Sequence, residues 1–257
     1  MKRFLCAFLA FSAIVWAQDE SKNEPESDID GVKLLNQIVQ ANEARDITEL
    51  AGLMEDVVTF AKAATAPAQV DPIAAELRKS LKAAKGNHGT QRKIITALGE
   101  LRSKNGTKIL KRIAFQKKAR DENAEELQAI AILAISVQRD PKMIAKLADQ
   151  MKSRSLVIAK AGMACFKNYG PSKGKTRRNI AELLMKRMEA ERPAKGQGGK
   201  VSGEAQKRWQ ALAPVIVESM QSICRESTIT DVENWRQWWK EIGKNRKSSP
   251  WRDEPKE

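Results

Sequence analysis

Residues 94–117, IITALGELRSKNGTKILKRIAFQK, and residues 129–152, AIAILAISVQRDPKMIAKLADQMK, repeat one pattern at an offset of 35 residues. Aligned at this offset, the two stretches match at Ile95 and Ile130, Leu98 and Leu133, Ile109 and Ile144, and Lys111 and Lys146. Each stretch has an apolar helical pattern, a polar turn and a second helical pattern. A repeat of this period predicts stacked helix pairs, each burying its apolar face against the next pair.

Helix signals continue along most of the chain, and strand signals are nearly absent. Capping patterns mark helix starts at Asp46, Asn123 and Thr230, and Asp-Pro pairs mark two more at Asp71 and Asp140. With the apolar periodicity, they predict an all-α chain of about eleven helices. The expected ranges are 31–42, 47–64, 72–85, 91–102, 107–118, 124–138, 141–152, 154–168, 173–190, 203–226 and 231–243.

The two copies resemble HEAT-like helical repeats in their details. The first helix is apolar, the turn is of the Asp/Asn-Gly/Pro kind, and the second helix carries Lys111 or Lys146 after its first turn. A looser third copy keeps Met163 at the position of Leu133 and then inserts a longer basic turn. Tetratricopeptide repeats have Trp, Gly-Tyr and Ala-Phe positions that find no counterpart here. The resemblance implies a right-handed α-solenoid of antiparallel helix pairs over residues 31–190.

The start of the chain has the pattern of an export signal. Met1-Lys2-Arg3 precedes an apolar run of about a dozen residues, so residues 1–17 are expected to be a signal peptide. An uncleaved anchor is the alternative, although a membrane span needs about 20 apolar residues. No later segment of the sequence is apolar enough to cross a membrane. We therefore expect a periplasmic or extracellular protein.

An acidic leader precedes a basic body. Residues 18–30 hold six acidic residues and one lysine, a composition that favours a disordered linker. The whole chain has a net charge of +14, and its first 30 residues hold three basic and six acidic residues, so residues 31–257 carry +17. A strongly basic body favours acidic partners.

A Gly-rich segment separates the C-terminal part. The composition predicts a flexible Gly/Lys loop at 191–203, a helical cap at 204–243 and a disordered tail at 244–257. Trp235, Trp238 and Trp239 lie on one helical stripe, which predicts a structural cap over the open end of the stack. A stacking surface for sugars or peptides is the alternative. The Trp-x-x-Trp-Trp spacing is similar to the tail that follows HEAT-like repeats in some exported bacterial proteins.

Two basic clusters are candidate sites for an anion or a partner. The first copy carries Lys108, Lys111 and Arg112, followed by Lys117, Lys118 and Arg120. The basic turn of the third copy carries Lys173, Lys175, Arg177 and Arg178. Equivalent helices of a stacked array line one face, so the two clusters could merge into a basic groove. The alternative is the ordinary solvated face of a basic protein.

Signals for enzyme chemistry are nearly absent. Residues 170–176, GPSKGKT, have three residues where a phosphate-binding loop needs four, and they follow an expected helix rather than a strand. The lone histidine, His88, excludes metal sites built from His and Cys. After residues 1–17, only Cys165 and Cys224 remain, as a disulfide or as two buried thiols. We expect no cofactor and no nucleotide. A hydrolase with paired carboxylates is the enzyme alternative.

These patterns favour a non-catalytic scaffold that binds a protein partner in the periplasm or cell envelope. An acidic polymer, such as a polysaccharide, a lipid phosphate or a nucleic acid, is the alternative ligand. A polymer site requires that the cations of both clusters lie on one surface. A protein site requires an exposed concave face of apolar or mixed character.

Overall fold

The structure is a computed structural model that describes residues 30–64, 67–117, 119, 121–193, 203–245 and 249–252. These residues form eleven α-helices and no strand, which confirms the all-α prediction. The helices are α1 (Gly31–Ala44), α2 (Ile47–Ala63), α3 (Pro67–Ala83), α4 (His88–Glu100), α5 (Lys104–Ala114), α6 (Glu122–Ser136), α7 (Ile144–Gln150), α8 (Leu156–Ala164), α9 (Gly174–Glu191), α10 (Gly203–Cys224) and α11 (Val232–Trp238). Four short turns accompany them: η1 (Pro141–Met143), η2 (Cys165–Tyr169), the π-helical η3 (Trp239–Gly243) and η4 (Ser249–Trp251).

Several predicted segments lie wholly or mostly outside the residues that the structure describes. The signal peptide at 1–17 and all of the acidic linker except Asp30 lie outside the described residues, as does most of the loop at 191–203. Asp30 itself is the N-cap of α1 and accepts a hydrogen bond from the backbone N–H of Val32 at 2.8 Å.

Two helix starts follow the expected capping chemistry. Asp46 accepts hydrogen bonds from the backbone N–H groups of Thr48 and Glu49 at 3.0 and 2.9 Å. Asp140 accepts one from Lys142 at 2.9 Å, ahead of the proline that begins η1. These bonds satisfy N–H groups that have no partner within the helix.

The helix start expected at Asp71-Pro72 is wrong. Helix α3 begins at Pro67, and Pro72 lies inside it. Val70 is buried in the core, so packing favours a helical turn ahead of Pro72.

Two other caps are displaced by one or two residues. The N-caps of α6 and α11 are Asp121 and Asp231, rather than Asn123 and Thr230. Each aspartate accepts a hydrogen bond from the backbone N–H three residues later, at 2.8 and 2.9 Å. A carboxylate is a stronger acceptor than an amide or hydroxyl oxygen, and its charge suits the positive end of the helix dipole.

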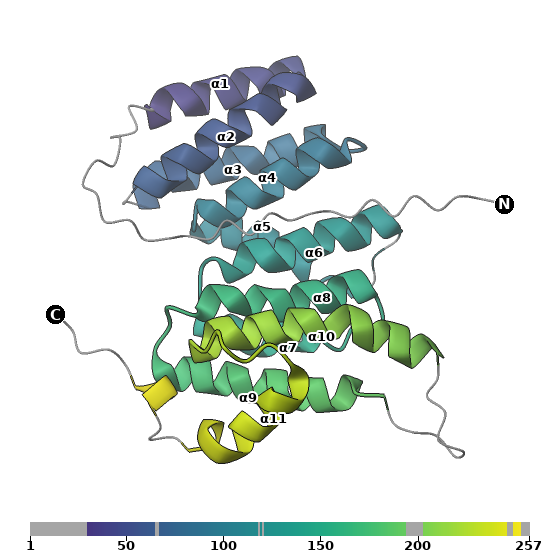
Figure 1. Cartoon of the computed structure of the whole chain (residues 1–257). Helices are drawn as coiled ribbons and strands as arrows, with labels where there is room; N and C mark the ends of the chain where they lie inside the picture. The colour runs from purple at the N-terminus through teal and green to yellow at the C-terminus, as the bar shows by residue number, and fades with distance from the viewer. Residues whose placement is uncertain are drawn as a thin grey trace.

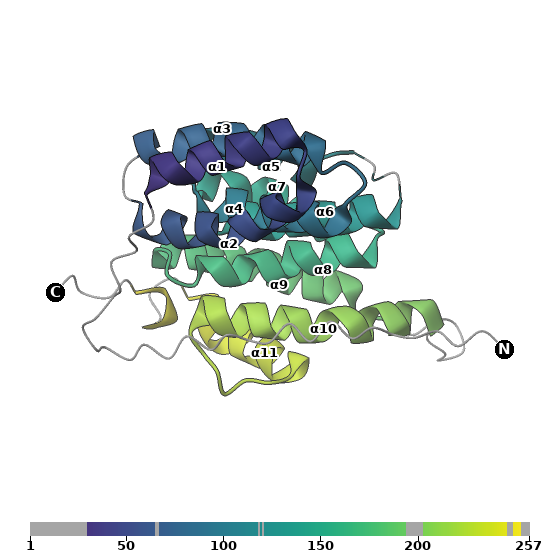
Figure 2. The same cartoon turned by 90° about the horizontal axis from the view of Figure 1, so that it is seen from above.

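The helices stack in two rows. Helices α2, α4, α6, α8 and α10 contact one another in succession, and α1, α3 and α5 do the same. In Figure 1 the even-numbered helices lie one below another in front, with α3, α5 and α7 behind them. Figure 2, seen from above, shows that successive levels are displaced, so that α10 and α11 lie to one side of α1 and α3.

Small residues let neighbouring helices approach closely. A Cβ atom added to Gly99 of α4 would lie 2.8 Å from the Cβ and the carbonyl oxygen of Ala134 in α6. A Cβ on Gly162 of α8 would lie 2.7 Å from the backbone nitrogen of Met151. Of the core positions expected from the repeat, Leu98 and Met163 are fully buried, and Leu133 is half-buried.

A similar turn links three pairs of consecutive helices. Arg45, Arg102 and Arg139 adopt the left-handed conformation, with φ of 55, 47 and 53°. Each is followed at once by the N-cap of the next element, Asp46, Ser103 or Asp140. The left-handed residue ends one helix, and the cap begins the next one. Two of these turns belong to the repeated stretches.

The C-terminal tail, expected to be disordered from residue 244, contains an ordered turn. Trp251 of η4 is buried, and its Nε1 donates a hydrogen bond to the carbonyl oxygen of Gly243 at 3.0 Å. The turn lies so close to α9 that a Cβ on Gly174 would come within 1.8 Å of the Trp251 carbonyl oxygen. Burial of the indole and close packing against α9 order this part of the tail.

Candidate partner-binding surfaces

The two rows of helices differ in charge. Helices α1, α3, α5, α7 and α9 with η1, here called the basic row, hold fifteen Lys or Arg residues and seven Asp or Glu residues. The even-numbered helices α2 to α10, the acidic row, hold six basic and nine acidic residues. The net charges are thus +8 and −3. Among these helices, the excess of positive charge lies on the odd-numbered ones.

Helix α5 carries the first predicted cluster. Lys108 and Arg112 are exposed, Lys111 is half-buried, and the helix contains no acidic residue. None of the three forms an ion pair with another described residue. Lys117 is exposed beyond the helix end, while Lys118 and Arg120 lie outside the described residues. The α5 cluster is an unneutralised basic surface.

The second predicted cluster is split by the fold. Lys173 and Lys175 are exposed at the start of α9, but Arg177 is only 1% exposed. Its guanidinium donates to the carbonyl oxygens of Ser172, Ile223 and Arg252 at 3.0, 3.2 and 3.3 Å. Arg177 therefore does not lie on an exposed basic face. It joins the η2–α9 turn, the end of α10 and the C-terminal turn.

A basic groove that includes Arg177 does not form, because Arg177 is buried. In Figure 1, α7 lies between the levels of α5 and α9. The exposed cation Lys146 of α7 is held near the Phe115 ring, with its Nζ 5.8 Å from the ring centroid. The requirement that both clusters, with Arg177, share one surface is not met.

The tryptophan stripe is part of a compact aromatic cluster. Trp235 is fully buried, and Trp238 and Trp239 are almost so. Trp238 contacts Trp235 edge-on at a centroid distance of 5.2 Å, and Trp251 contacts Trp238 and Trp239 at 6.1 and 6.3 Å. Edge-to-face contacts of this kind are favourable aromatic geometry. Little ring surface remains for stacking on a sugar.

Two adjoining hollows flank α9, and we call them together the α9 groove. The first, about 700 Å³, lies between α9 and the C-terminal segment and is lined by Arg178, Glu182, Met185, Lys186, Glu189, Arg236, Trp239, Lys240 and Lys244. The second, about 660 Å³, is lined by Pro141, Ile144, Lys175, Thr176, Arg178, Asn179, Glu182 and Trp251. Arg178 and Glu182 belong to both. The groove thus joins the predicted basic turn to the tryptophan cap.

The cations of the C-terminal segment were not among the candidate residues expected from the sequence. Arg236, Lys240 and Lys244 recur at intervals of four residues, so they could share one face of a helix. This four-residue spacing is the sequence signal that could have identified them as one basic face. Their position opposite Arg178 depends on tertiary contacts, among them the hydrogen bond from Arg178 Nη2 to the Lys244 carbonyl oxygen at 3.1 Å.

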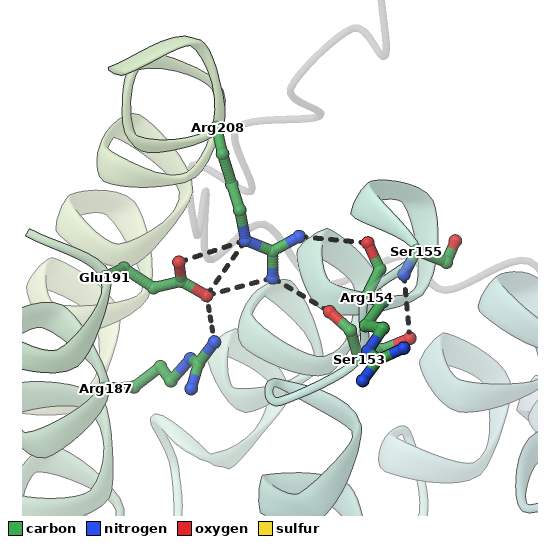
Figure 3. Close-up of polar contacts among 6 residues, drawn as sticks. All are labelled: Ser153, Arg154, Ser155, Arg187, Glu191 and Arg208. Atoms are coloured by element: carbon green, nitrogen blue, oxygen red, sulfur yellow. Dashed lines mark hydrogen bonds and ion pairs between the residues drawn. The ribbon is translucent and has the colours of Figure 1, made fainter. Parts of the chain in front are cut away.

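A half-buried charge cluster holds α9 and α10 to the α7–α8 turn (Figure 3). Glu191 pairs with Arg187 and accepts from Arg208 Nε and Nη2 at 3.0 and 2.9 Å. Arg208 also donates to the carbonyl oxygens of Ser153 and Arg154 at 2.8 and 3.1 Å. Burial raises the pKa of Glu191, but the hydrogen bonds from Arg208 and Arg187 outweigh it and leave that pKa below its ordinary value. We assign this cluster a structural role, because each charge is already paired.

The nucleophilic side chains of the core are held neutral. Cys165 and Cys224 are free and buried, and burial raises the pKa of both thiols. Burial likewise raises the pKa of Tyr169, whose hydroxyl donates to the Asp140 carbonyl oxygen at 3.1 Å. Thiols in this state are poor nucleophiles.

The described part of the chain contains no group of three or more His, Cys, Asp or Glu side chains placed to hold a metal ion. None of its helices combines the length and apolar character needed to cross a membrane. The segment before residues 170–176 is helical, as expected, rather than a strand.

No family model matches the chain, and neither a curated protein nor a solved structure matches it. Any assignment of function therefore depends on the surfaces of the molecule itself.

Proposed function

We propose that the protein is an exported, non-catalytic helical-repeat scaffold that binds an acidic protein partner through its basic row. The observation that carries the proposal is the difference in charge between the two rows, +8 against −3. A charge difference of this kind orients an acidic partner and speeds its association.

The HEAT-like solenoid is part of the same proposal. The succession of contacts α2–α4–α6–α8–α10, together with the shared left-handed turns, supports antiparallel helix pairs stacked in register. Stacked pairs form extended surfaces that suit macromolecular partners more than small substrates.

Export is supported by the pattern of residues 1–17, and mass spectrometry of the secreted protein should show a chain that begins at Gln18.

An acidic polymer is the second candidate ligand. The unpaired cations of the α5 cluster favour it, because phosphate or sulfate groups could bind them without displacing an internal ion pair. The burial of Arg177 removes one cation from the polymer site that the sequence predicts.

The test compares two charge-reversal variants with equal change in net charge. Lys108→Glu/Arg112→Glu alters the α5 cluster, and Lys62→Glu/Lys207→Glu alters exposed lysines of the acidic row. The immobilised proteins are incubated with envelope proteins at about 50 mM and at about 300 mM NaCl. Attraction between surface charges is strong at the lower concentration and largely screened at the higher one. In parallel, their retention on heparin is measured over the same salt range.

We expect the wild-type protein and the acidic-row variant to retain the same acidic protein, and the α5 variant to lose it. Equal capture by all three proteins would refute a role for the basic row. Heparin retention that collapses between the two salt concentrations, without capture of any protein, would replace the proposed partner with an acidic polymer.

A further inference from the structure

The α9 groove combines an apolar floor with a basic rim. Met185 and Trp239 are the apolar residues that line the first hollow, and Ile144 and Trp251 line the second. All four side chains are nearly buried, so the floor is set by the core and does not depend on mobile surface groups.

The charge of the rim is positive after its internal pairs are counted. Glu182 pairs with Lys186 at 2.9 Å, and Glu189 pairs with Arg236 at 2.5 Å. The three remaining lysines of the rim are exposed and form no ion pair with another described residue: Lys175, Lys240 and Lys244. Both acids of the groove are thus neutralised, while cations remain for a ligand.

Arg178 lies in the wall that the two hollows share. Its Nη2 donates to the Lys244 carbonyl oxygen, and its Nε is buried and has no hydrogen-bond partner among the described residues. A buried N–H without an acceptor is costly, and a guanidinium favours carboxylates because it can donate to both oxygens. An anion bound beside Arg178 would offset part of this cost, because it would accept hydrogen bonds from the guanidinium.

From this arrangement we propose that the α9 groove binds a linear segment of the protein partner in which carboxylates alternate with apolar side chains. The inference rests on the proposed function and names where the partner docks. Carboxylates of the segment contact Lys175, Arg178, Lys240 and Lys244, and its apolar side chains enter the two hollows. The apolar floor favours a peptide over a uniformly charged polymer, which has nothing to place there. The two hollows, side by side across Arg178, require an extended ligand.

The test uses labelled probes and fluorescence anisotropy. The first probe is a peptide with leucine after every second glutamate, the second is oligo-glutamate with the same number of carboxylates, and the third is a heparin oligosaccharide. The groove variant is Lys240→Glu/Lys244→Glu, and the matched control is Lys62→Glu/Lys207→Glu, with the same change in net charge. All four residues are exposed, and unchanged circular dichroism and melting temperature verify the fold of each variant.

We expect the leucine-containing peptide to bind the wild-type protein about tenfold more tightly than oligo-glutamate, because only it fills the hollows. The groove variant should weaken its binding by about tenfold or more, and the control by less than about twofold. Equal affinity for the peptide and oligo-glutamate, or tighter binding of heparin, would overturn the peptide assignment. Equal loss in both variants would show attraction by net charge alone and would also overturn it.

The groove and the basic row can fail separately. If envelope capture depends on the α5 cluster while the peptide binds both variants equally, the groove assignment is wrong and the proposed function stands. If the peptide depends on Lys240 and Lys244 while no envelope protein is captured, the groove is a peptide site and the proposed function is wrong.

Discussion

At the scale of single residues, buried charged groups hold distant parts of this chain together. Arg177 donates to carbonyl groups from three separate segments, and Arg208 donates to two more beside its ion pair with Glu191. Removing one member of such a group leaves the others buried without partners, which costs more than the bond itself contributes. In a basic protein, these arginines stabilise the fold and are not available to a ligand.

Glu191 should make the stability of the protein depend on acid pH. Its pKa in the folded protein lies below the ordinary value of 4.5, so the ionised carboxylate stabilises the fold above that pH. This contribution is lost as the pH falls through the folded-state pKa. Between about pH 5 and pH 3 we expect the unfolding free energy of the wild-type protein to fall more steeply than that of Glu191→Gln. Urea denaturation at a series of pH values measures both slopes.

The control for this experiment is Glu204→Gln. Glu204 is an exposed residue in the first turn of α10, on the same helix as Arg208. Its variant should keep the wild-type slope. An identical slope for wild-type protein and Glu191→Gln would show that the pairs with Arg187 and Arg208 do not stabilise the carboxylate.

At the scale of helices, the separation between neighbours depends on glycine at the crossings. Helices α4 and α6 meet at Gly99 and Ala134 with no room for another methyl group. Gly52 in α2 provides the opposite case, because a Cβ there would meet no atom within 4 Å. The same substitution should therefore have opposite effects at the two sites.

We expect Gly99→Ala to lower the unfolding free energy by about 1–3 kcal/mol, since the added methyl group forces the helices apart. Gly52→Ala should raise it by roughly 0.5–1 kcal/mol, because alanine loses less conformational entropy in a helix than glycine does. Urea denaturation of both variants tests the pair. A Gly99→Ala protein as stable as Gly52→Ala would mean that α4 and α6 do not pack as closely as described.

At the scale of the whole molecule, the C-terminal segment packs at the end of the stack that holds α9 and α10, at the bottom of Figure 1. Trp251 packs on Trp238 and Trp239, its Nε1 bonds Gly243, and Arg177 binds the adjacent carbonyl of Arg252. Trp251 also lines the second hollow of the α9 groove. Stability and the proposed site therefore share the same segment.

Trp251→Ala should destabilise the protein by about 3 kcal/mol through the cavity it leaves. For a chain of this size, the loss corresponds to a melting temperature lower by about 6–12 °C. Trp209, which is only half-buried on α10, provides the control, and Trp209→Ala should have a smaller effect. Differential scanning calorimetry measures both. A melting temperature unchanged by Trp251→Ala would show that η4 does not contribute to the folded core.

Local patterns predicted much of the fold. Eleven helices were expected and the described residues form eleven, because apolar periodicity and capping act over three or four residues. The errors lie at α3, where burial of Val70 extended the helix across Pro72, and at caps where a nearby aspartate replaced the expected residue. In each case a contact or a stronger acceptor prevailed over the local signal.

The sequence by itself determined the helical class, the basic charge of the body and the residues able to form the aromatic cluster. Only the tertiary structure decided which cations face solvent. Arg177 and Arg178 are neighbours in the chain, yet Arg177 is buried among carbonyl groups and Arg178 lines a groove. The wall opposite Arg178 comes from Lys244, 66 residues away. Helix formation depends on neighbours in sequence, whereas burial and binding surfaces depend on which distant segments pack together.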